Sequence, residues 1–200
     1  QWFISMEKNN LRKKALKAID DTKFYPARGK ERIRSMIETR PDWCISRQRV
    51  WGVPLPIFVS KKTNEPLRDS EVIENIAKIY EREGADCWFD DDPQKFLGKK
   101  YKKEDYIKST DICEVWFDSG STHSFVLEKR KDLTWPASMY LEGSDQHRGW
   151  FHSSLLESCG TRGRAPFNSI LSHGFVVDGK GLKMSKSTGN IIAPEDILKK

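Results

Sequence analysis

Lys183 and Lys186 lie three residues apart in the sequence Lys-Met-Ser-Lys-Ser, residues 183–187, which has the residue types that bind a polyphosphate. The next residues, Thr-Gly-Asn, continue the stretch with small side chains. Hydroxyls and backbone N–H groups bind phosphate oxygens, and lysines supply point charge. Small residues also let the backbone approach a ligand closely. We therefore interpret this stretch as a loop for triphosphate chemistry, and the alternative is a solvated basic loop.

A second polar segment, residues 142–150, follows a short apolar run and has the sequence Glu-Gly-Ser-Asp-Gln-His-Arg-Gly-Trp. Glu142 is suited to hold an ammonium group or a ribose hydroxyl, and Gly143 would let the backbone approach a purine or ribose. Asp145 and Gln146 would face a ligand from the first helical turn. The alternative is that these two are ordinary first-turn residues, because the helix dipole favours an acid there. Their place at a strand end favours ligand binding.

Aromatic and histidine side chains supply further candidates. Trp116 and Trp150 are large, rigid and apolar, so they are suited to wall a pocket for an aliphatic side chain. The alternative is that both are core aromatics. Trp51 is a weaker candidate for contact with substrate or an RNA end, with a scaffold role as the alternative. His173 lies alone in an apolar segment, where most histidines are structural, but its nearness in sequence to the lysine loop favours contact with ATP.

Composition excludes several classes of protein. The 200 residues suit one large domain or a domain with an insert, and 37% hydrophobic with 32% charged residues indicate a folded chain. The net charge of +6 fits a polyanionic partner such as ATP or RNA. The four cysteines form no C-x-x-C pair, so we expect no local zinc site in this chain. We see no membrane span and no signal peptide, and we expect a cytoplasmic protein.

In the first half of the chain, the sequence pattern predicts two helices and a polar insert, with the second helix inside the insert. Apolar residues recur at helical spacing over 28–40 and again over 70–83, the second with Ser70 as its N-cap and with Val72, Ile73, Ile76, Ala77 and Tyr80 on its inner face. Residues 43–59 indicate extended structure. Residues 61–110 are rich in charge and poor in strand signals, which favours an insertion.

The second half predicts strands that alternate with helices. Apolar runs at 115–117, at 139–141 and over 170–177 are expected as strands, with helices over 121–128 and 144–159. This alternation predicts an α/β fold with a parallel sheet. Ligands bind beyond the carboxyl ends of such strands, where the polar segments lie.

Four motifs in this order resemble the isoleucyl, valyl and leucyl subgroup of class I aminoacyl-tRNA synthetases. They are Trp-Cys-Ile-Ser-Arg-Gln-Arg-Val-Trp-Gly-Val-Pro (residues 43–54), Trp-Phe-Asp-Ser-Gly (116–120), the segment around 140–151, and the lysine loop. The segment 141–151 is similar to the isoleucyl members in particular, of bacterial or organellar type. The resemblance runs through nearly the whole chain and is weakest over 61–110.

The resemblance implies a fold, substrates and partners. It implies the second half of a Rossmann-like parallel-sheet catalytic domain with an α+β connective insert. The enzyme would activate isoleucine with ATP and Mg²⁺, transfer it to tRNA(Ile), and act as a monomer when intact; a zinc ion is expected only outside this fragment. It implies four parts: residues 1–60 as the return from an editing insertion and the start of the second catalytic half, 61–112 as the insert, 113–177 as the Rossmann-like half, and 178–200 as the lysine loop with the start of a helical region.

The resemblance also assigns residue roles. It implies that Lys183 and Lys186 are catalytic and that Trp116 and Trp150 line the amino-acid pocket. The residues around ATP and the adenylate would be Glu142, Gly143, Asp145, Gln146, His173, Met184, Ser185 and Lys186.

The family's other motif, His-x-Gly-His, is absent from these 200 residues, as are an editing domain and anticodon-binding helices. The chain opens without Met and stops within an expected helix, so we interpret it as an internal fragment that is inactive alone. Alternatives are a valyl- or leucyl-type synthetase, another nucleotidyltransferase with such a loop, or a non-catalytic tRNA-binding relative. The intact lysines and Glu142 weigh against lost chemistry.

Overall fold

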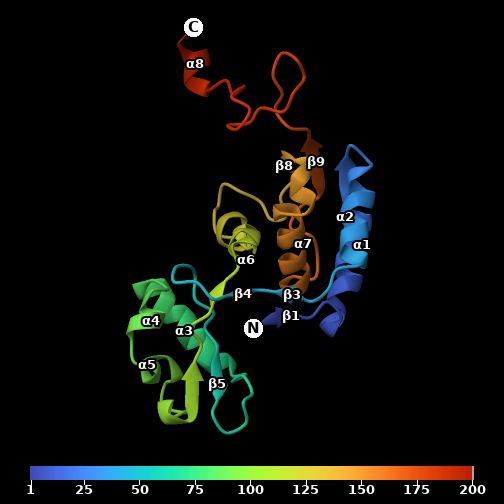
Figure 1. Cartoon of the computed structure of the whole chain (residues 1–200). Helices are drawn as coiled ribbons and strands as arrows, with labels where there is room; N and C mark the ends of the chain where they lie inside the picture. The colour runs from blue at the N-terminus through green and yellow to red at the C-terminus, as the bar shows by residue number, and fades with distance from the viewer. Residues whose placement is uncertain (200) are drawn as a thin grey trace. The chain divides into compact units, whose positions relative to one another are not determined.

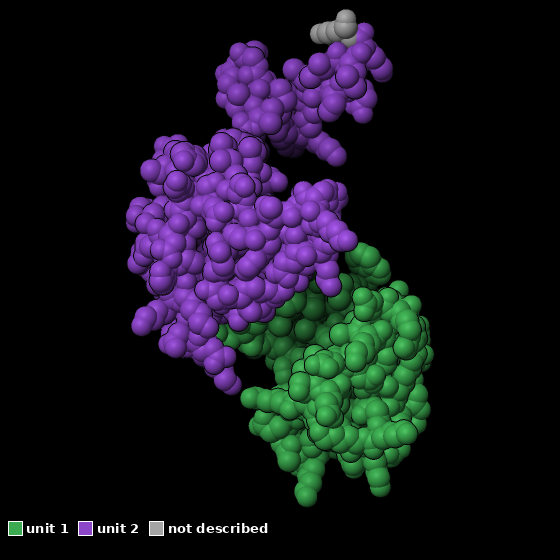
Figure 2. Space-filling view, turned by 180° about the vertical axis from the view of Figure 1, so that it is seen from behind, with its two compact units in different colours: residues 1–6, 41–119 green, residues 7–40, 120–200 purple. Residues whose placement is uncertain are grey.

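The computed structural model describes residues 1–199, which divide into two compact units (Figure 2). Unit 1 comprises residues 1–6 and 41–119, and unit 2 comprises residues 7–40 and the chain from Gly120 onward. The chain therefore passes between the units at three points. The four-part division that the sequence suggests stays a prediction.

Unit 1 is built from short antiparallel ladders and short helices. The strand pairs are β1 (Phe3–Ile4) with β3 (Trp43–Cys44), β4 (Ser46–Arg47) with β7 (Ile112–Cys113), and β5 (Phe58–Ser60) with β6 (Tyr106–Lys108). The helices are α3 (Ser70–Glu83), α4 (Cys87–Asp90), α5 (Pro93–Leu97), the 3₁₀ turn η2 (Lys103–Asp105) and α6 (Val115–Gly120), at whose end the chain enters unit 2.

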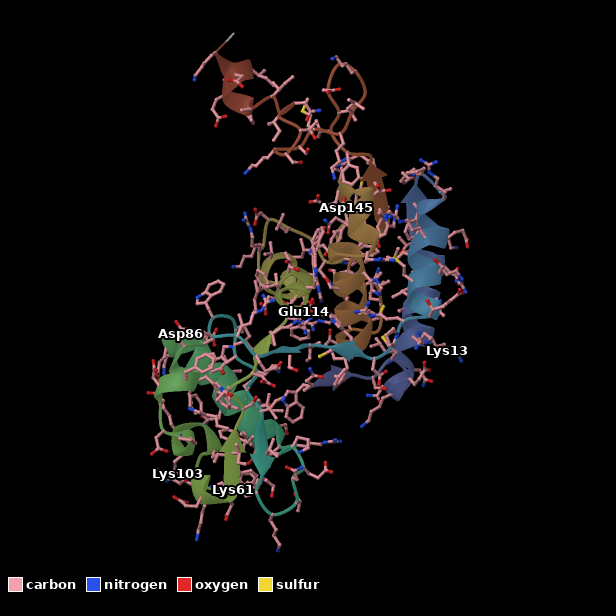
Figure 3. The ribbon with its side chains drawn as sticks, in the orientation of Figure 1. Lys13, Lys61, Asp86, Lys103, Glu114 and Asp145 are labelled. Carbon is pink, nitrogen blue, oxygen red and sulfur yellow. The ribbon has the colours of Figure 1, made fainter. Side chains whose placement is uncertain are left out.

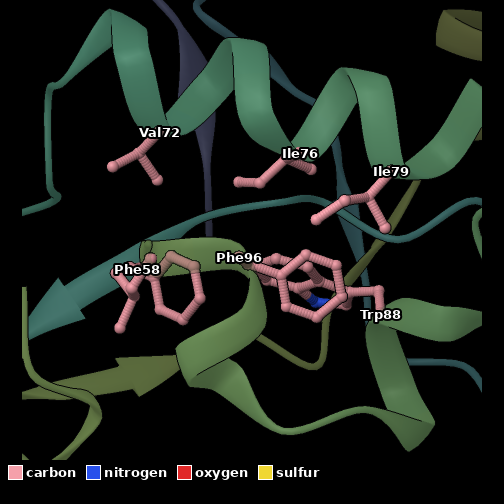
Figure 4. Packing of buried hydrophobic residues seen from close by; sticks show 7 residues of the cluster. Phe58, Val72, Ile76, Ile79, Trp88 and Phe96 are labelled. Atoms are coloured by element: carbon pink, nitrogen blue, oxygen red, sulfur yellow. The ribbon is translucent and has the colours of Figure 1, made fainter. Parts of the chain in front are cut away.

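An aromatic core holds the predicted insert together (Figure 4). Trp88 is fully buried, and its ring centroid lies 5.0 Å from that of Phe58 and 5.0 Å from that of Phe96. Its indole N–H donates to the carbonyl oxygen of Ser109 at 2.8 Å, which satisfies the one polar atom of the ring. The buried members of the cluster are Phe58, Val72, Ile76, Ile79, Trp88, Phe96 and Leu97.

Helix α3 confirms the predicted helix but corrects its N-cap and its buried face. The N-cap is Asp69, whose Oδ1 accepts the Glu71 N–H at 2.9 Å, rather than Ser70. Ile79 is buried, whereas Ile73 is 57% exposed and Ala77 is exposed. The buried stripe therefore follows the spacing i, i+4, i+7 from residue 72. It is narrower than the apolar face predicted from the sequence, because Ile73 and Ala77 lie outside it.

Unit 2 contains a parallel sheet with strand order β2-β9-β8 (Figure 1). The strands are β2 (Lys23–Tyr25), β9 (Ser169–His173) and β8 (Tyr140–Gly143). The sheet confirms the predicted α/β class. Helix α7 (Trp150–Thr161) connects β8 to β9, the right length for a crossover between parallel neighbours.

Helices α1 (Leu11–Asp21) and α2 (Gly29–Glu38) pack on each other, and α1 packs on α7 (Figure 1). Helix α7 is buried along nearly its whole length, as expected for a helix between a sheet and other helices. The remaining elements are η1 (Lys8–Asn10), the π-helical turn η3 (His123–Leu127), the 3₁₀ turn η4 (Ser144–His147) and α8 (Pro194–Leu198).

Three predicted elements differ in the structure. Residues 115–117 lie in α6 rather than in a strand, because the N–H groups of Phe117 and Asp118 bond to the Glu114 carbonyl and start a helical turn. The helix predicted over 144–159 is split into η4 and α7 at Gly149. The strand predicted up to residue 177 ends at His173.

Candidate active site

Glu142, Gly143 and His173 lie next to one another at the carboxyl ends of two paired strands. In the parallel register of β8 and β9, Glu142 is opposite Ser172 and Gly143 is opposite His173. Glu142 and His173 are both exposed. His173 Nδ1 lies 2.6 Å from the carbonyl oxygen of Gly174, which can only accept, so Nδ1 donates this hydrogen bond. These residues occupy the edge at which parallel sheets bind ligands.

Gly143 leaves room for the Asp145 side chain to fold over it. A Cβ at position 143 would lie 2.5 Å from Asp145 Oδ1 and 3.8 Å from His173 Cε1. Asp145 itself is exposed at the end of the sheet (Figure 3). The glycine therefore lets a carboxylate lie close to the backbone at the end of β8, beside the histidine of β9.

Gln146 links this edge to helix α7. Its Nε2 donates to Asp145 Oδ2 at 3.1 Å, and its Oε1 accepts the backbone N–H of Trp150 at 2.9 Å. The amide thereby satisfies one of the N–H groups that a helix N-terminus leaves without an intrahelical partner. Gln146 positions Asp145, a role that the sequence did not indicate.

A cavity of about 260 Å³ opens at the same edge of the sheet. It is lined by Pro26, Arg28, Gly29, Arg32, Ser144, His147, Ser172, His173 and Gly174. Arg28 and Arg32 make no hydrogen bond or ion pair through their guanidinium groups within residues 1–199, and no acidic residue lines the cavity. The cavity therefore suits an anionic group.

The arginines of this cavity were not predicted from the sequence, because residues 23–25 were not expected to form a strand. The signal was present: Phe24 is apolar, and Pro26 and Gly29 follow it before a basic helix start. Such a run can end a short strand and begin a helix at the carboxyl edge of a sheet.

His147 in η4 and His152 in α7 are both buried and contribute to packing. His147 is 1% exposed, and its Nδ1 lies 2.7 Å from the Ser144 carbonyl oxygen. Burial lowers the pKa of His147, and burial lowers the pKa of His152 to about 3. Both rings are therefore neutral at physiological pH, and of the two only His147 lines the cavity.

The lysine loop follows β9 and is exposed. The Lys183 ammonium lies 3.7 Å from the centroid of the Phe175 ring, a cation–π contact. The Lys186 ammonium makes no hydrogen bond or ion pair within the described residues, so it is available to a ligand. Met184 and Ser185 are half-buried.

Within residues 1–199, no hydrogen bond or ion pair joins the lysine loop to the polar residues at the end of β8. The structure brings Glu142, Gly143, Asp145, Gln146 and His173 together, and it places the loop ten residues downstream of His173 along the same chain segment. Contact of both with one nucleotide stays a prediction.

The two tryptophans of the predicted amino-acid pocket belong to different units. Trp150 is half-buried in unit 2. Trp116 is 42% exposed in unit 1, where it lines a cavity of about 540 Å³ with Arg47, Arg49 and Trp51. A pocket shared by Trp116 and Trp150 stays a prediction.

A group of possible metal ligands lies in unit 1, away from these residues in the sequence. Glu83, Cys87 and Asp91 bring their ligand atoms within 4.8 Å of one another. The Lys95 ammonium already bonds to Glu83 at 2.5 Å and to Asp91 at 2.7 Å. A bound cation would have to displace this lysine, so the group is better explained as an ion-paired cluster.

Comparison with known proteins places this geometry in a family. Residues 1–200 match the model of the class I tRNA synthetases of the I, L, M and V group, and the chain belongs to this family. Enzymes of this family use ATP and Mg²⁺ in general. No helix among residues 1–199 is long and apolar enough to cross a bilayer.

Within this family, the chain is most informatively compared with isoleucine–tRNA ligases. The chain is 81% identical to an isoleucine–tRNA ligase of Pelagibacter ubique over 200 residues, which are 100% of this chain and 22% of that protein. It is 58% identical to an isoleucine–tRNA ligase of Brucella abortus, covering 100% of this chain and 21% of that protein. The chain thus spans about a fifth of the length of these relatives. The resemblance of the sequence to the isoleucyl members is confirmed.

A solved structure agrees on the fold. A LeuRS from Agrobacterium radiobacter, in a ternary complex with tRNA and LeuAMS, aligns with a TM-score of 0.52 at 21% identity, over 84% of this chain and 25% of that chain. This similarity confirms the Rossmann-like class I synthetase fold.

Proposed function

We propose that the full-length protein to which this chain belongs activates isoleucine with ATP and transfers it to tRNA(Ile). The observation that carries the proposal is the 81% identity to an isoleucine–tRNA ligase over every residue of the chain. The polar strand ends support it, as does the Lys186 ammonium, which has no partner within residues 1–199, because they supply the donors and charges that an adenylate needs.

In the proposed mechanism, the isoleucine carboxylate attacks the α-phosphorus of ATP and pyrophosphate leaves. The protein contributes positioning and charge stabilisation. Lys186, helped by Lys183 and Ser185, binds the triphosphate more tightly as negative charge moves to the leaving group. Such differential binding accelerates the step.

The residues at the strand ends have distinct proposed roles. Glu142 contacts the isoleucyl part of the adenylate, and Gly143 lets the backbone approach the ribose or purine. Asp145, Gln146 and His173 surround the nucleotide, with Gln146 also fixing Asp145 through the 3.1 Å hydrogen bond. Trp116 and Trp150 line the pocket for the aliphatic side chain.

Mg²⁺, when bound to ATP, neutralises phosphate charge. Among residues 1–199, the one set of three or more clustered metal-ligating side chains is the Glu83 group, and Lys95 bonds to two of its members. We therefore assign no protein ligand to Mg²⁺ here and derive no step through it.

The test is ATP–pyrophosphate exchange by the full-length protein with isoleucine, valine and leucine in parallel. We expect the fastest exchange with isoleucine. Exchange with valine should be measurable but about 10–200-fold slower, because the one methylene that distinguishes the two side chains contributes about 1–3 kcal/mol to discrimination. Faster exchange with valine or leucine would favour the other members of the subgroup. No exchange with any of them, together with tRNA binding, would favour a non-catalytic tRNA-binding relative.

We further propose that the full-length protein is a cytoplasmic monomer, and that residues 1–200 have no exchange activity alone. Exchange by the isolated chain near the full-length rate would overturn the second point. Light scattering of the full-length protein would test whether it is a monomer.

A further inference from the structure

The side chains of Asp178 and Asn190 flank the lysine loop and bond to each other. Asn190 Nδ2 donates to Asp178 Oδ2 at 2.8 Å across twelve residues of sequence. This contact closes the segment between them into a ring that contains both Lys183 and Lys186. We call this contact the Asp178–Asn190 pair.

Asp178 organises the turn before Lys183. Its Oδ1 accepts the backbone N–H groups of Lys180 and Leu182, each at 2.9 Å. The Asp178 N–H donates to the Leu182 carbonyl at 2.8 Å, and Gly181 supplies the positive φ of 78° that this turn needs. One carboxylate thus fixes the chain reversal, and its second oxygen is left for Asn190.

Asn190 reaches the backbone of the lysine loop itself. Its Oδ1 accepts the Ser185 N–H at 3.0 Å, and its Nδ2 also approaches the Lys183 carbonyl at 3.3 Å. The Ser185 hydroxyl in turn contacts Thr188 Oγ1 at 2.6 Å. The Asn190 amide therefore holds the backbone on both sides of Met184, at the Lys183 carbonyl and at the Ser185 N–H.

We propose that Asp178 and Asn190 are positioning residues for adenylation: their side-chain pair holds the backbone that carries Lys183 and Lys186 in one arrangement before ATP binds. The proposal rests on the proposed function. Charges that are already in place stabilise a transition state without a cost of reorganisation. Loss of the pair should lower the rate of the chemical step and leave isoleucine binding unchanged, because neither residue lies at the strand ends where isoleucine is expected.

The atoms of the pair allow a swap experiment. In Asp178→Asn, an amide NH₂ replaces the oxygen that accepts from Asn190, so two donors face each other. In Asn190→Asp, two carboxylates face each other. The double variant Asp178→Asn/Asn190→Asp restores a donor and an acceptor with their roles exchanged, and its new acid can still accept the Ser185 N–H, but it cannot donate to the Lys183 carbonyl as Asn190 does.

The readout is ATP–pyrophosphate exchange by the full-length protein. We expect each single variant to lower kcat about tenfold or more, the effect of losing one hydrogen bond to a charged group. The KM for isoleucine should stay within about twofold, and the double variant should be faster than either single variant without reaching the parent kcat, because it restores the pair but not the contact with the Lys183 carbonyl. Asp132→Asn is the matched control, because it removes only an exposed ion pair with Arg130.

Each outcome decides the proposal. Single variants with the parent kcat, or a double variant as slow as the slower single variant, would overturn it. Asn190→Ala provides a second disruption without added charge, so a folded Asn190→Ala protein with unchanged kcat overturns the proposal even if another variant fails to fold. If Lys186→Ala is slow and the pair variants are not, only the pair is wrong; if the parent shows no isoleucine-dependent exchange, the proposed function is wrong as well.

Discussion

Tyr140 and Trp150 stack face to face, with ring centroids 4.1 Å apart and planes 3° apart. Tyr140 is buried in β8, and Trp150 is the first residue of α7. The Tyr140 hydroxyl lies 3.1 Å from Ser154 Oγ, one turn further along the helix. The indole that is predicted to line the amino-acid pocket therefore also fixes the start of α7 against the strand that carries Glu142.

Removal of this stack should affect both the helix and substrate binding. We expect Trp150→Ala to raise the KM for isoleucine and to speed amide hydrogen exchange in α7 by up to about tenfold, because an aromatic pair contributes about 0.5–1.5 kcal/mol beyond its buried area. Trp150→Phe keeps a stacked ring and serves as the control. Unchanged hydrogen exchange in the alanine variant would show that the stack does not hold α7.

A side chain at Gly143 should disrupt the nucleotide site. The added Cβ of Gly143→Ala would lie 2.5 Å from Asp145 Oδ1, so the carboxylate must move. We expect kcat/KM for ATP to fall about tenfold to a hundredfold, since small misplacements of binding groups have effects of this size.

Gly160→Ala in α7 is the matched control, because its Cβ would meet only Leu11 Cδ1 at 3.7 Å, an ordinary contact. Steady-state exchange kinetics of the two full-length variants make the comparison. Equal kcat/KM values for ATP would mean that Asp145 and the backbone at Gly143 lie outside the nucleotide site.

Long periodic segments and strand ends were predictable from the sequence. Helix α2 lies within the predicted range 28–40, and α3 matches the predicted range 70–83. Residues 139–141 predicted β8, with its polar carboxyl end from Glu142 onward. His173 was expected inside a strand that continued to residue 177, so its place beside Gly143 at the same edge comes from the structure.

Short segments were not predictable, because three residues carry no periodicity. The strand Lys23–Tyr25 went unassigned, so Arg28 and Arg32 were missed. The run 115–117 was interpreted as a strand, although Glu114 starts a helical turn there. The Asp178–Asn190 pair depends on two side chains twelve residues apart in irregular backbone, where no pattern of the sequence predicts a contact.

Acid should destabilise the protein through His152. This ring is 3% exposed, and burial, with smaller effects of Arg40 and Arg148, lowers its pKa from 6.5 to about 3. Between these pH values the unfolded chain binds a proton that the folded chain does not. The stabilising contribution is therefore fully present above pH 6.5 and is lost as the pH falls toward 3, at about 1.4 kcal/mol per pH unit.

Because burial also lowers the pKa values of His123 and His147, the test needs a variant that isolates His152. Urea unfolding should be measured between pH 7.5 and 5. The free energy of unfolding should fall less steeply with decreasing pH for His152→Gln than for the parent, because the variant lacks the one proton that the unfolded parent takes up at His152. The exposed His173→Gln serves as the control for the loss of an imidazole. Parallel pH dependences of the parent and His152→Gln would contradict a buried neutral ring in the folded state.

Lys186→Ala should separate catalysis from amino-acid binding. The Lys186 ammonium is exposed and without a partner in the described residues, so its removal should leave the fold intact. If it binds the triphosphate most tightly in the transition state, the exchange kcat in the full-length protein should fall about 10²–10³-fold. The KM for isoleucine should change little.

Lys180→Ala provides the matched control for this loop. Lys180 is also an exposed lysine, and it contributes to the turn only through its backbone N–H, which alanine keeps. A general loss of positive charge near the nucleotide would slow both variants equally, whereas a specific role slows only Lys186→Ala. A raised isoleucine KM with an unchanged kcat in Lys186→Ala would place this lysine at the amino acid instead of the triphosphate.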